Sequence, residues 1–406
     1  TFVVLANDNK GRLNDLVSRL EAQGIELYKN ADVITVDKAR THSGDSSKNF
    51  SIPAGSLIIP NRQPDAPLVA AIMEFDAELS KSVLIEERQK TLKYGSSIMY
   101  DTTAWNFTMM YGLPAVTLDQ ELSSGLTPWS DVNSEYEVDL TANAWSVDGA
   151  DDRSVAFAAR LMEQGVKVRI LDQSTKFSKT KLSRGSVVVM TVDNPNYPDL
   201  AQLISGEASA LKLALSSINS GYGSGDLPDW GGRHFRLLNR PQIAILSHSG
   251  FNSYDVGASW WTIDHHLGIR HSQINASFLN RADLRRYNTI VMPSGSADLS
   301  ESELKALKIW VQQGGTLIAH GRSSNSLATE AGIGSVRRVQ DSFEQASDYD
   351  LIIQREWLAQ SDKLDMEKAM SQSINFDISY PWDTGANALS KDELERRDKW
   401  QSLFMP

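Results

Sequence analysis

The sequence has no cysteine among its 406 residues, and this absence removes several kinds of chemistry at once. Disulfide bonds, thiolate metal sites and cysteine nucleophiles are all excluded. The cellular compartment stays open, because a secreted protein need not carry disulfides. Any nucleophilic catalysis by this chain would therefore have to use another side chain.

Long apolar runs and an excess of positive charge are also missing. No apolar run approaches the roughly 18 residues that a membrane-spanning helix requires, and no signal peptide is visible. The formal net charge is −11 and there is no lysine- and arginine-rich cluster, so we expect neither nucleic acid nor a membrane as partner. The chain begins TFVVLAND, inside a strand-like run and without methionine, so we expect it to be a piece of a longer protein.

The length is sufficient for two or three domains, and the first two hundred residues contain an internal resemblance. RLNDLVSRLEAQGIELY and RSVAFAARLMEQGVKVR share arginine, leucine, glutamine and glycine positions at an offset of 141. Each predicts an amphipathic helix that ends at a glycine suited to a left-handed cap, Gly24 or Gly165. A strand is expected to follow each helix, at 25–27 and at 166–170.

The resemblance continues downstream, where IPAGSLIIPNRQPDAPLVAAIM (52–73) parallels LSRGSVVVMTVDNPNYPDLAQLI (182–204). In both segments Gly-Ser opens an apolar strand, prolines break it and a helix follows. The first segment carries about eleven extra residues between its glycines, which fits the polar stretch 40–49. We expect one α/β unit used twice and packed as a single domain. Its parts would be copy one at 1–120, a linker at 121–137 and copy two at 138–220.

From residue 241 strands and helices alternate. Apolar strands are expected at 242–247, 272–279, 287–296 and 316–321, and helices at 255–268, at 300–315 and from 323 onwards. Ser300 and Glu303 form a capping box for the clearest helix, and Gly314 ends it. The pattern predicts an α/β fold with a flavodoxin-like, doubly wound parallel sheet over 241–336. A linker at 221–240 would precede this domain, and a polar helical extension at 337–406 would follow it.

Ligands of doubly wound sheets bind at the carboxyl ends of the strands. The predicted strands end at SHSG, PSGS and AHGRSS, so their polar side chains would meet at one edge. The candidate binding residues are His248, Ser294, His320 and Ser323, with Ser247, Ser249 and Ser296 beside them. A loop histidine at 320 and a helix-capping serine at 323 are the structural alternatives. No catalytic residue, metal ligand or cofactor is assigned to this chain.

Other motifs allow a chemical and a structural interpretation, and the structural one is favoured for each. DHHLGIRH (264–271) could hold a metal, but consecutive helical side chains point to different sides. GYGSGDLPDWGG (221–232) lacks the Gly-Lys-Ser/Thr ending of a phosphate loop. Of the adjacent Trp260 and Trp261, one is expected to pack in the core. YDTTAW (100–105) could contact an absent domain or form a turn over a buried tryptophan.

Three segments occur in the order of a known family: PAGSLIIPNRQPDAPLV, MYDTTAWNFTMMYGLPA (99–115) and the stretch from RPQIAIL to GGTLIAHG. Over most of residues 1–335 the chain resembles the C-terminal part of large bacterial zinc-carboxypeptidase-like proteins of the carboxypeptidase A superfamily. In that family an N-terminal peptidase domain precedes α/β regions, the last similar to class I glutamine amidotransferases. The resemblance implies a periplasmic or secreted parent, a metallocarboxypeptidase that hydrolyses C-terminal amino acids from peptides, with zinc polarising the carbonyl.

The chain departs from this family at two points. None of its seven histidines is followed by glutamate three residues later, so the zinc-binding peptidase motif is absent, and zinc is implied only for the missing peptidase domain. Ala319-His320-Gly321 stands where amidotransferase-like proteins usually carry Cys-His-Gly, which excludes thiol catalysis. We therefore expect an accessory region whose partner is its own N-terminal peptidase domain. The alternatives are a module that binds a small polar ligand, such as a carboxylate or glycan, and a serine hydrolase that uses Ser323 or Ser294.

Overall fold

The structure is a computed structural model, and its chain divides into two compact units. The first unit comprises Thr1–Phe75 and Asn106–Ser335, and the second comprises Asp76–Trp105 and Val336–Pro406. The described residues are 1–75, 79–94, 97, 99, 106–122, 124–130, 138–177, 180–248, 250–295, 299–327 and 333–334. The expected extension at 337–406, the motif at 100–105, Ser249 and Ser296 lie outside them. No helix among the described residues is long and apolar enough to cross a membrane.

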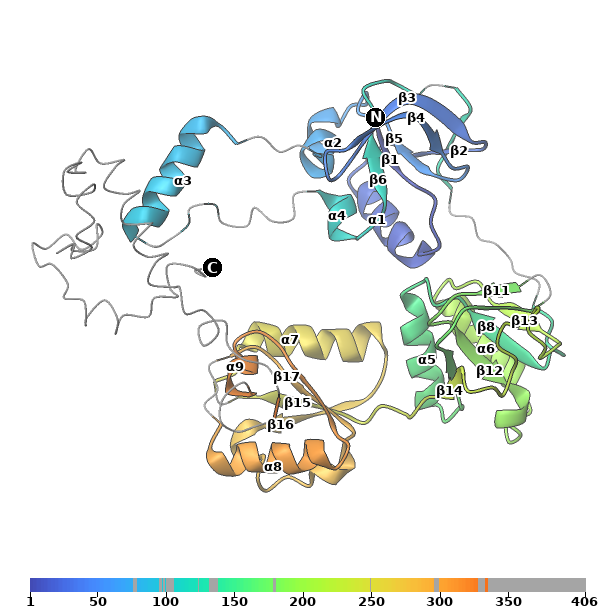
Figure 1. The fold of residues 1–406 in the computed structure, drawn as a ribbon, viewed down its shortest axis with the longest axis vertical. Coiled ribbons are helices and arrows are strands. Elements are labelled where there is room, and N and C mark those ends of the chain that lie inside the picture. The colour runs from blue at the N-terminus through green and yellow to red at the C-terminus, as the bar shows by residue number, and fades with distance from the viewer. Residues whose placement is uncertain are drawn as a thin grey trace, which may run out of the picture. The chain divides into compact units, whose positions relative to one another are not determined.

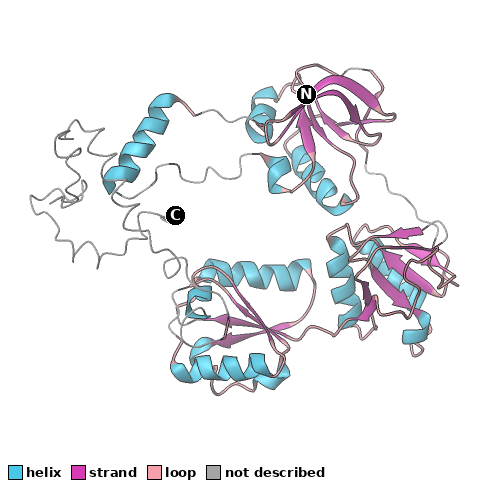
Figure 2. Ribbon diagram, in the orientation of Figure 1, coloured by secondary structure: helices cyan, strands magenta, loops and turns pink. Residues whose placement is uncertain are grey.

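The first unit contains three lobes, each with its own sheet and helices (Figures 1 and 2). The first lobe, residues 1–75 and 106–130, has an antiparallel sheet in the order β4-β3-β6-β1-β5-β2-β7. Its strands are β1 (Phe2–Val4), β2 (Tyr28–Asn30), β3 (Ile34–Thr41), β4 (Ser46–Ile52), β5 (Leu57–Ile59), β6 (Ala115–Thr117) and β7 (Leu126–Pro128). Its helices are α1 (Lys10–Ala22), α2 (Ala66–Met73) and α4 (Phe107–Met110), whereas α3 (Lys81–Tyr94) belongs to the second unit. Part of the expected linker at 121–137 is thus strand β7.

Alternating side chains divide the first lobe into two cores. Phe2 and Val4 of β1 pack with the apolar face of α1, including Leu16 and Leu20, whereas Val3 packs on the opposite face of the sheet. Gly24 follows the C-cap of α1 and has a left-handed φ of +78°, as its position predicts. The next strand begins only at Tyr28, not at residue 25, because the Ile25 amide still bonds to Leu20 O and closes the helix.

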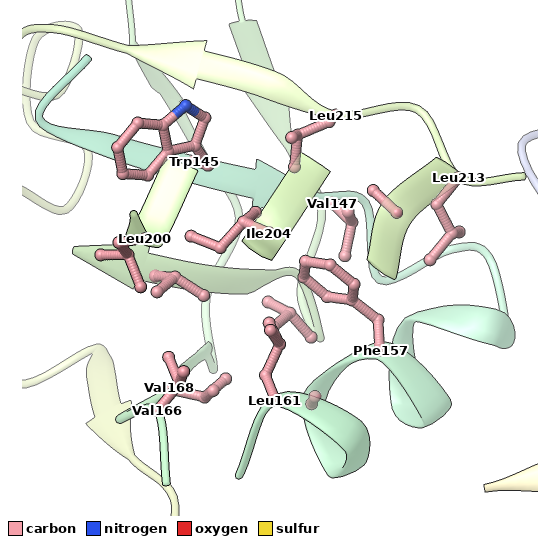
Figure 3. Close-up of a cluster of buried hydrophobic side chains, with 14 of the residues drawn as sticks. Trp145, Val147, Phe157, Leu161, Val166, Val168, Leu200, Ile204, Leu213 and Leu215 are labelled. Carbon is pink, nitrogen blue, oxygen red and sulfur yellow. The ribbon is translucent and has the colours of Figure 1, made fainter. Parts of the chain in front are cut away.

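The second lobe, residues 138–240, has a five-stranded antiparallel sheet in the order β13-β8-β12-β9-β14 and a separate hairpin, β10-β11. Its strands are β8 (Ala144–Val147), β9 (Arg169–Leu171), β10 (Thr175–Phe177), β11 (Thr180–Leu182), β12 (Val187–Met190), β13 (Ser216–Ile218) and β14 (Phe235–Leu237). α5 (Arg153–Glu163) and α6 (Leu200–Ala210) supply its helices, with a 3₁₀ turn at Thr191–Asp193. Figure 3 shows Phe157 and Leu161 of α5 in the core with Trp145 and Val147 of β8.

Residues 221–240, expected to be a linker, are part of the second lobe. β14 pairs with β9, and Trp230 packs edge-on against Phe177 with ring centroids 5.9 Å apart. Apolar side chains at 230 and 235 thus cover the face of the sheet that the helices leave open. The glycine content of this stretch predicted flexibility, but the side chains of Trp230 and Phe235 anchor it.

The sheets of the first and second lobes have matching strand orders, β6-β1-β5-β2-β7 in the first lobe and β13-β8-β12-β9-β14 in the second. In each lobe a buried serine at the start of a central strand accepts a backbone N–H across the sheet. Ala6 N donates to Ser56 Oγ at 3.0 Å, and Gly149 N donates to Ser186 Oγ at 3.1 Å. The glycine before each serine has a left-handed φ, +79° at Gly55 and +90° at Gly185.

The third lobe, residues 241–334, has a parallel sheet in the order β16-β15-β17-β18. Its strands are β15 (Ile243–Ser247), β16 (His271–Asn275), β17 (Thr289–Met292) and β18 (Thr316–Ala319). Its helices are α7 (Ser253–Trp261), a π-helical turn (Thr262–His266), α8 (Glu301–Gln312) and α9 (Ser323–Leu327), with 3₁₀ turns at Ala276–Phe278 and Leu284–Arg286. The expected strand at 272–279 ends at Asn275, because that side chain caps the 3₁₀ turn.

Helices cover both faces of this parallel sheet, α7 on one side and α8 on the other (Figure 1). Leu246 faces Leu307 and Trp310 of α8, whereas Ile245 faces the side that Ile263 covers. The predicted capping box of α8 is confirmed, with both of its hydrogen bonds present, and Gly314 follows with a φ of +100°. The α/β class and the parallel sheet predicted for this region are therefore confirmed.

His42 is expected to make the stability of the first lobe depend on pH. Its Nε2 lies 2.6 Å from Thr108 Oγ1, which itself donates to Asn106 Oδ1, and its ring stacks on Phe75. Burial lowers the pKa of His42 below its ordinary 6.5, while the Asn106 hydrogen bond opposes the shift. The unfolded chain therefore binds this proton more tightly, so the first lobe should lose stability as the pH falls through about 6.5.

This pH dependence can be measured by hydrogen-exchange mass spectrometry of first-lobe peptides between pH 7.5 and 5.5, after correction for intrinsic exchange rates. His42 is the only histidine in residues 1–130, so His42→Gln should flatten the profile. A profile of unchanged slope in that variant would assign the dependence to other groups.

Candidate binding edge of the parallel sheet

The turns that follow β15, β17 and β18 are hydrogen-bonded to one another. Phe251 forms an isolated bridge with Gly295, and Asn252 N donates to Ser294 O at 2.9 Å. On the other side, Arg322 N donates to Ser294 Oγ at 3.2 Å. The turn after β17 therefore joins the turns of both neighbouring strands, and the three together form one edge at the carboxyl ends of the sheet.

Two of the four candidate side chains at this edge act as structural ties. Ser323 is 2% exposed, and its hydroxyl donates to Pro293 O at 2.5 Å. Ser294 Oγ accepts the Arg322 amide and lies against Gly321, where an added Cβ would come within 2.3 Å of it. A nucleophilic serine needs a base within hydrogen-bond reach and an accessible oxygen. The hydroxyl of Ser323 instead fixes the turn after β18 to the turn after β17.

His248 occupies the first position after β15 and has a left-handed backbone, with a φ of +59°. This conformation is uncommon for a residue other than glycine and costs about 1 kcal/mol or more, and such strain concentrates at binding and catalytic sites. The side chain is exposed, and its Nδ1 lies 2.9 Å from the Oγ of the buried Ser247. Ser247 Oγ is farther, 3.5 Å, from Ile274 O.

The hydrogen bonds of Ser247 allow two arrangements of protons. Ser247 either donates to Ile274 O and accepts from Nδ1–H of His248, or it donates to Nδ1. When Ser247 donates to Nδ1 of His248, the imidazole carries its own proton on Nε2. Nε2 then presents an N–H donor at the edge of the sheet. A buried hydroxyl thus fixes the ring orientation of an exposed histidine.

His320 follows β18 and is also exposed. Its backbone amide donates to Met292 O at 3.2 Å, which continues the pairing of β18 with β17 beyond the last strand residue. One strand, β17, separates β15 from β18, so the backbones of the two histidine positions are about 10 Å apart. A small ligand with two acceptor groups could span that distance. Sequence reasoning identified both histidines but missed Asn252, whose side chain caps α7 while its amide joins two of the turns.

The histidines of DHHLGIRH lie on a different surface. The π-helical turn Thr262–His266 stacks the His265 ring on Trp261 with centroids 4.0 Å apart. The expectation that one of Trp260 and Trp261 packs in the core is wrong, because they are 40% and 46% exposed. Ile263, which is 6% exposed, fills the core position of this turn instead. Among the described residues no group of three or more metal-ligating side chains could hold a metal ion.

Comparison of the chain with family models, curated proteins and solved structures found no match. The family resemblance described above therefore depends on the sequence motifs alone. The geometry of the edge bears on function, through the exposed imidazoles of His248 and His320 and the serines that fix the turns around them.

Proposed function

We propose that the third lobe binds a small carboxylate ligand at the edge formed by the turns after β15, β17 and β18. The observation that carries the proposal is His248, an exposed imidazole held in a strained left-handed conformation and oriented by the buried Ser247. With a proton on Nε2 the ring offers a donor suited to a carboxylate oxygen. His320 offers a second polar group across β17. The serine-hydrolase alternative has less support, because Ser294 and Ser323 hold the turns together.

The order of the parallel strands supports a flavodoxin-like assignment for this lobe. Numbered along the chain, its strands lie in the order second, first, third and fourth, the beginning of the doubly wound order 2-1-3-4-5. Ligands of that fold bind at the carboxyl edge. Ala319 stands where an amidotransferase-like protein would carry cysteine, so the lobe in our proposal is glutamine amidotransferase-like in fold and binds without thiol chemistry.

The matching strand orders and serine contacts support two copies of one α/β unit in the first and second lobes. In our proposal the whole chain is the non-peptidase C-terminal region of a periplasmic or secreted zinc-metallocarboxypeptidase-like protein, and its partner is the N-terminal peptidase domain. Zinc and peptide hydrolysis then belong to that domain. The sequence motifs support this part of the proposal, and the geometry of the third lobe supports the ligand.

Isothermal titration with a panel of small mono- and dicarboxylates tests the binding proposal. A hydrogen bond to a charged group contributes about 1.5–3 kcal/mol, so His248→Ala should weaken binding of the best ligand about tenfold or more. His320→Ala should weaken binding of the same ligand. His234→Ala is the matched control, because His234 lies in the second lobe, paired with Asp172 at 2.7 Å, and should leave the affinity unchanged. Absence of binding across the panel, or wild-type affinity in the His248 and His320 variants, would contradict the proposal.

A further inference from the structure

The last helix of the second lobe is continuous, whereas the corresponding helix of the first lobe is in two pieces. α6 packs Leu200, Ile204 and Ala208 under its sheet. In the first lobe Val69 and Met73 at the end of α2 pack in the same way, and the buried Thr108 lies in α4. Aligning the two lobes on these packing positions matches Glu74 with Ser205 and Asn106 with Gly206. Ser205 and Gly206 are adjacent in the second lobe. Residues 75–105 have no counterpart.

Beyond the break the two lobes agree again, contact by contact. Leu113 N donates to Thr108 O at 2.9 Å, as Leu213 N donates to Ala208 O at 2.8 Å. Gly112 and Lys212, just before these leucines, share a left-handed φ of +58° and +54°. The matched arginines of α1 and α5 also reach equivalent carbonyls, Arg12 to Tyr111 O at 3.1 Å and Arg153 to Leu211 O at 3.2 Å. The helix therefore resumes in register after residue 105.

Asn106 closes the break. Its Nδ2 donates to Met73 O at 3.0 Å and to Glu74 O at 2.9 Å, which satisfies carbonyls at the end of α2. Its Oδ1 accepts the Met109 amide at 3.0 Å, which caps the start of α4. The residue is 3% exposed, so these backbone groups have little access to water. The second lobe has glycine at this position, inside a continuous helix that needs no such side chain.

A second addition to the first lobe contacts the same break. The β3-β4 hairpin is longer than the β10-β11 hairpin of the second lobe and carries His42 at its turn. His42 stacks on Phe75, with centroids 4.4 Å apart, and its Nε2 lies 2.6 Å from Thr108 Oγ1. His42 thus contacts Phe75, the last residue of the first unit before the interruption, and Thr108, which lies just after it. The second lobe lacks both the long hairpin and the interruption.

We infer that residues 75–105 are an insertion that interrupts the last helix of the first lobe. We also infer that the long β3-β4 hairpin stabilises the two ends of the insertion, because His42 contacts Phe75 and Thr108. Residues 76–105 carry the chain into the second compact unit, while Phe75 and Asn106 stay in the first. The inference rests on the proposed two-copy organisation and is independent of the proposed ligand. The first lobe is then a complete domain without the insertion, and Asn106 and His42 position the attachment point.

The test is a deletion that joins Glu74 directly to Asn106, measured in the full chain by hydrogen-exchange mass spectrometry. We expect one continuous helix from α2 to α4 and unchanged protection of β1, β5 and β6. A second variant replaces residues 76–105 with a Gly-Ser linker of equal length and keeps Phe75 and Asn106. Loss of first-lobe protection in both variants would contradict the inference that the segment is an insertion. Loss in the deletion alone would contradict the direct joining of Glu74 to Asn106. The second-lobe peptides are the internal control.

The substitution Asn106→Ala, made in the parent chain and in the deletion variant, distinguishes one interrupted helix from two independent helices. In the parent chain it removes the partners of Met73 O, Glu74 O and Met109 N, so protection of α4 should fall about tenfold or more. In the deletion those groups bond within one helix, so the same substitution should cause no loss. An equal loss in both backgrounds would contradict the inference. Carboxylate affinity at the third lobe should be the same in all of these variants, so this test and the titration above can fail separately.

Discussion

Replacing Gly149 with alanine is expected to destabilise the second lobe strongly. An alanine Cβ would lie 2.1 Å from the carbonyl carbon of Gly185 and 2.4 Å from the amide nitrogen of Ser186. Both are backbone atoms next to the central strand β12, so no side-chain rotation relieves the clash. The Gly149 amide also donates to the buried Ser186 Oγ, and a shift of either strand would break this bond. We expect a loss of about 3 kcal/mol of unfolding free energy.

Urea denaturation monitored by hydrogen exchange of second-lobe peptides measures this loss. Gly206→Ala is the matched control, because no atom lies within 4 Å of an added Cβ and the position is inside α6. That change should stabilise the lobe by about 0.5–1 kcal/mol, since alanine is the better helix former. Wild-type stability in the Gly149 variant would show that the turns at Gly149 and Gly185 can move apart without cost.

Features fixed by nearby residues could be predicted from the sequence. The capping box of α8 and the left-handed caps at Gly24 and Gly165 depend on a few residues within one turn, and all are present. The predicted first residues of the strands were less accurate. The hydrogen bond that closes the preceding helix uses a backbone amide that the apolar pattern assigned to the strand. The Val166 amide bonds to Leu161 O in this way, and pairing begins only at Arg169.

The meeting of the turns in the third lobe also followed from pattern, because parallel strands bring their carboxyl ends to one edge. The role of each side chain there did not. Whether Ser323 is exposed or donates to Pro293 O depends on the position of a different strand, and the left-handed backbone of His248 has no local signal such as glycine. These are properties of tertiary packing.

The sequence resemblance between the copies stopped at Met73 and Ile204, one residue before the break in the helix. The next equivalent residues are adjacent in the second lobe but separated by 75–105 in the first. Alignment by constant offset cannot cross such an insertion when only a few positions follow it. Backbone contacts recover the match, because the hydrogen bonds around Leu113 and Leu213 do not depend on side-chain identity.

Phe157→Ala is expected to destabilise the second lobe by about 3–5 kcal/mol, the usual cost of truncating a buried phenylalanine. Its side chain is fully buried between α5 and the sheet, in the core that includes Trp145, Val147 and Ile204 (Figure 3). The substitution removes a ring from the middle of this core, and the sheet fixes its other side, so the cavity cannot close completely.

Val155→Ala is the control for this substitution on the same helix. Val155 is 59% exposed, so its truncation should change the unfolding free energy by no more than about 0.5 kcal/mol. Urea unfolding with hydrogen exchange as readout should show the Phe157 loss in second-lobe peptides. Equal stability of the two variants would mean that the space around Phe157 collapses on truncation. A loss confined to Phe157→Ala would show that this apolar core, with no cysteine to cross-link it, supplies much of the stability of the lobe.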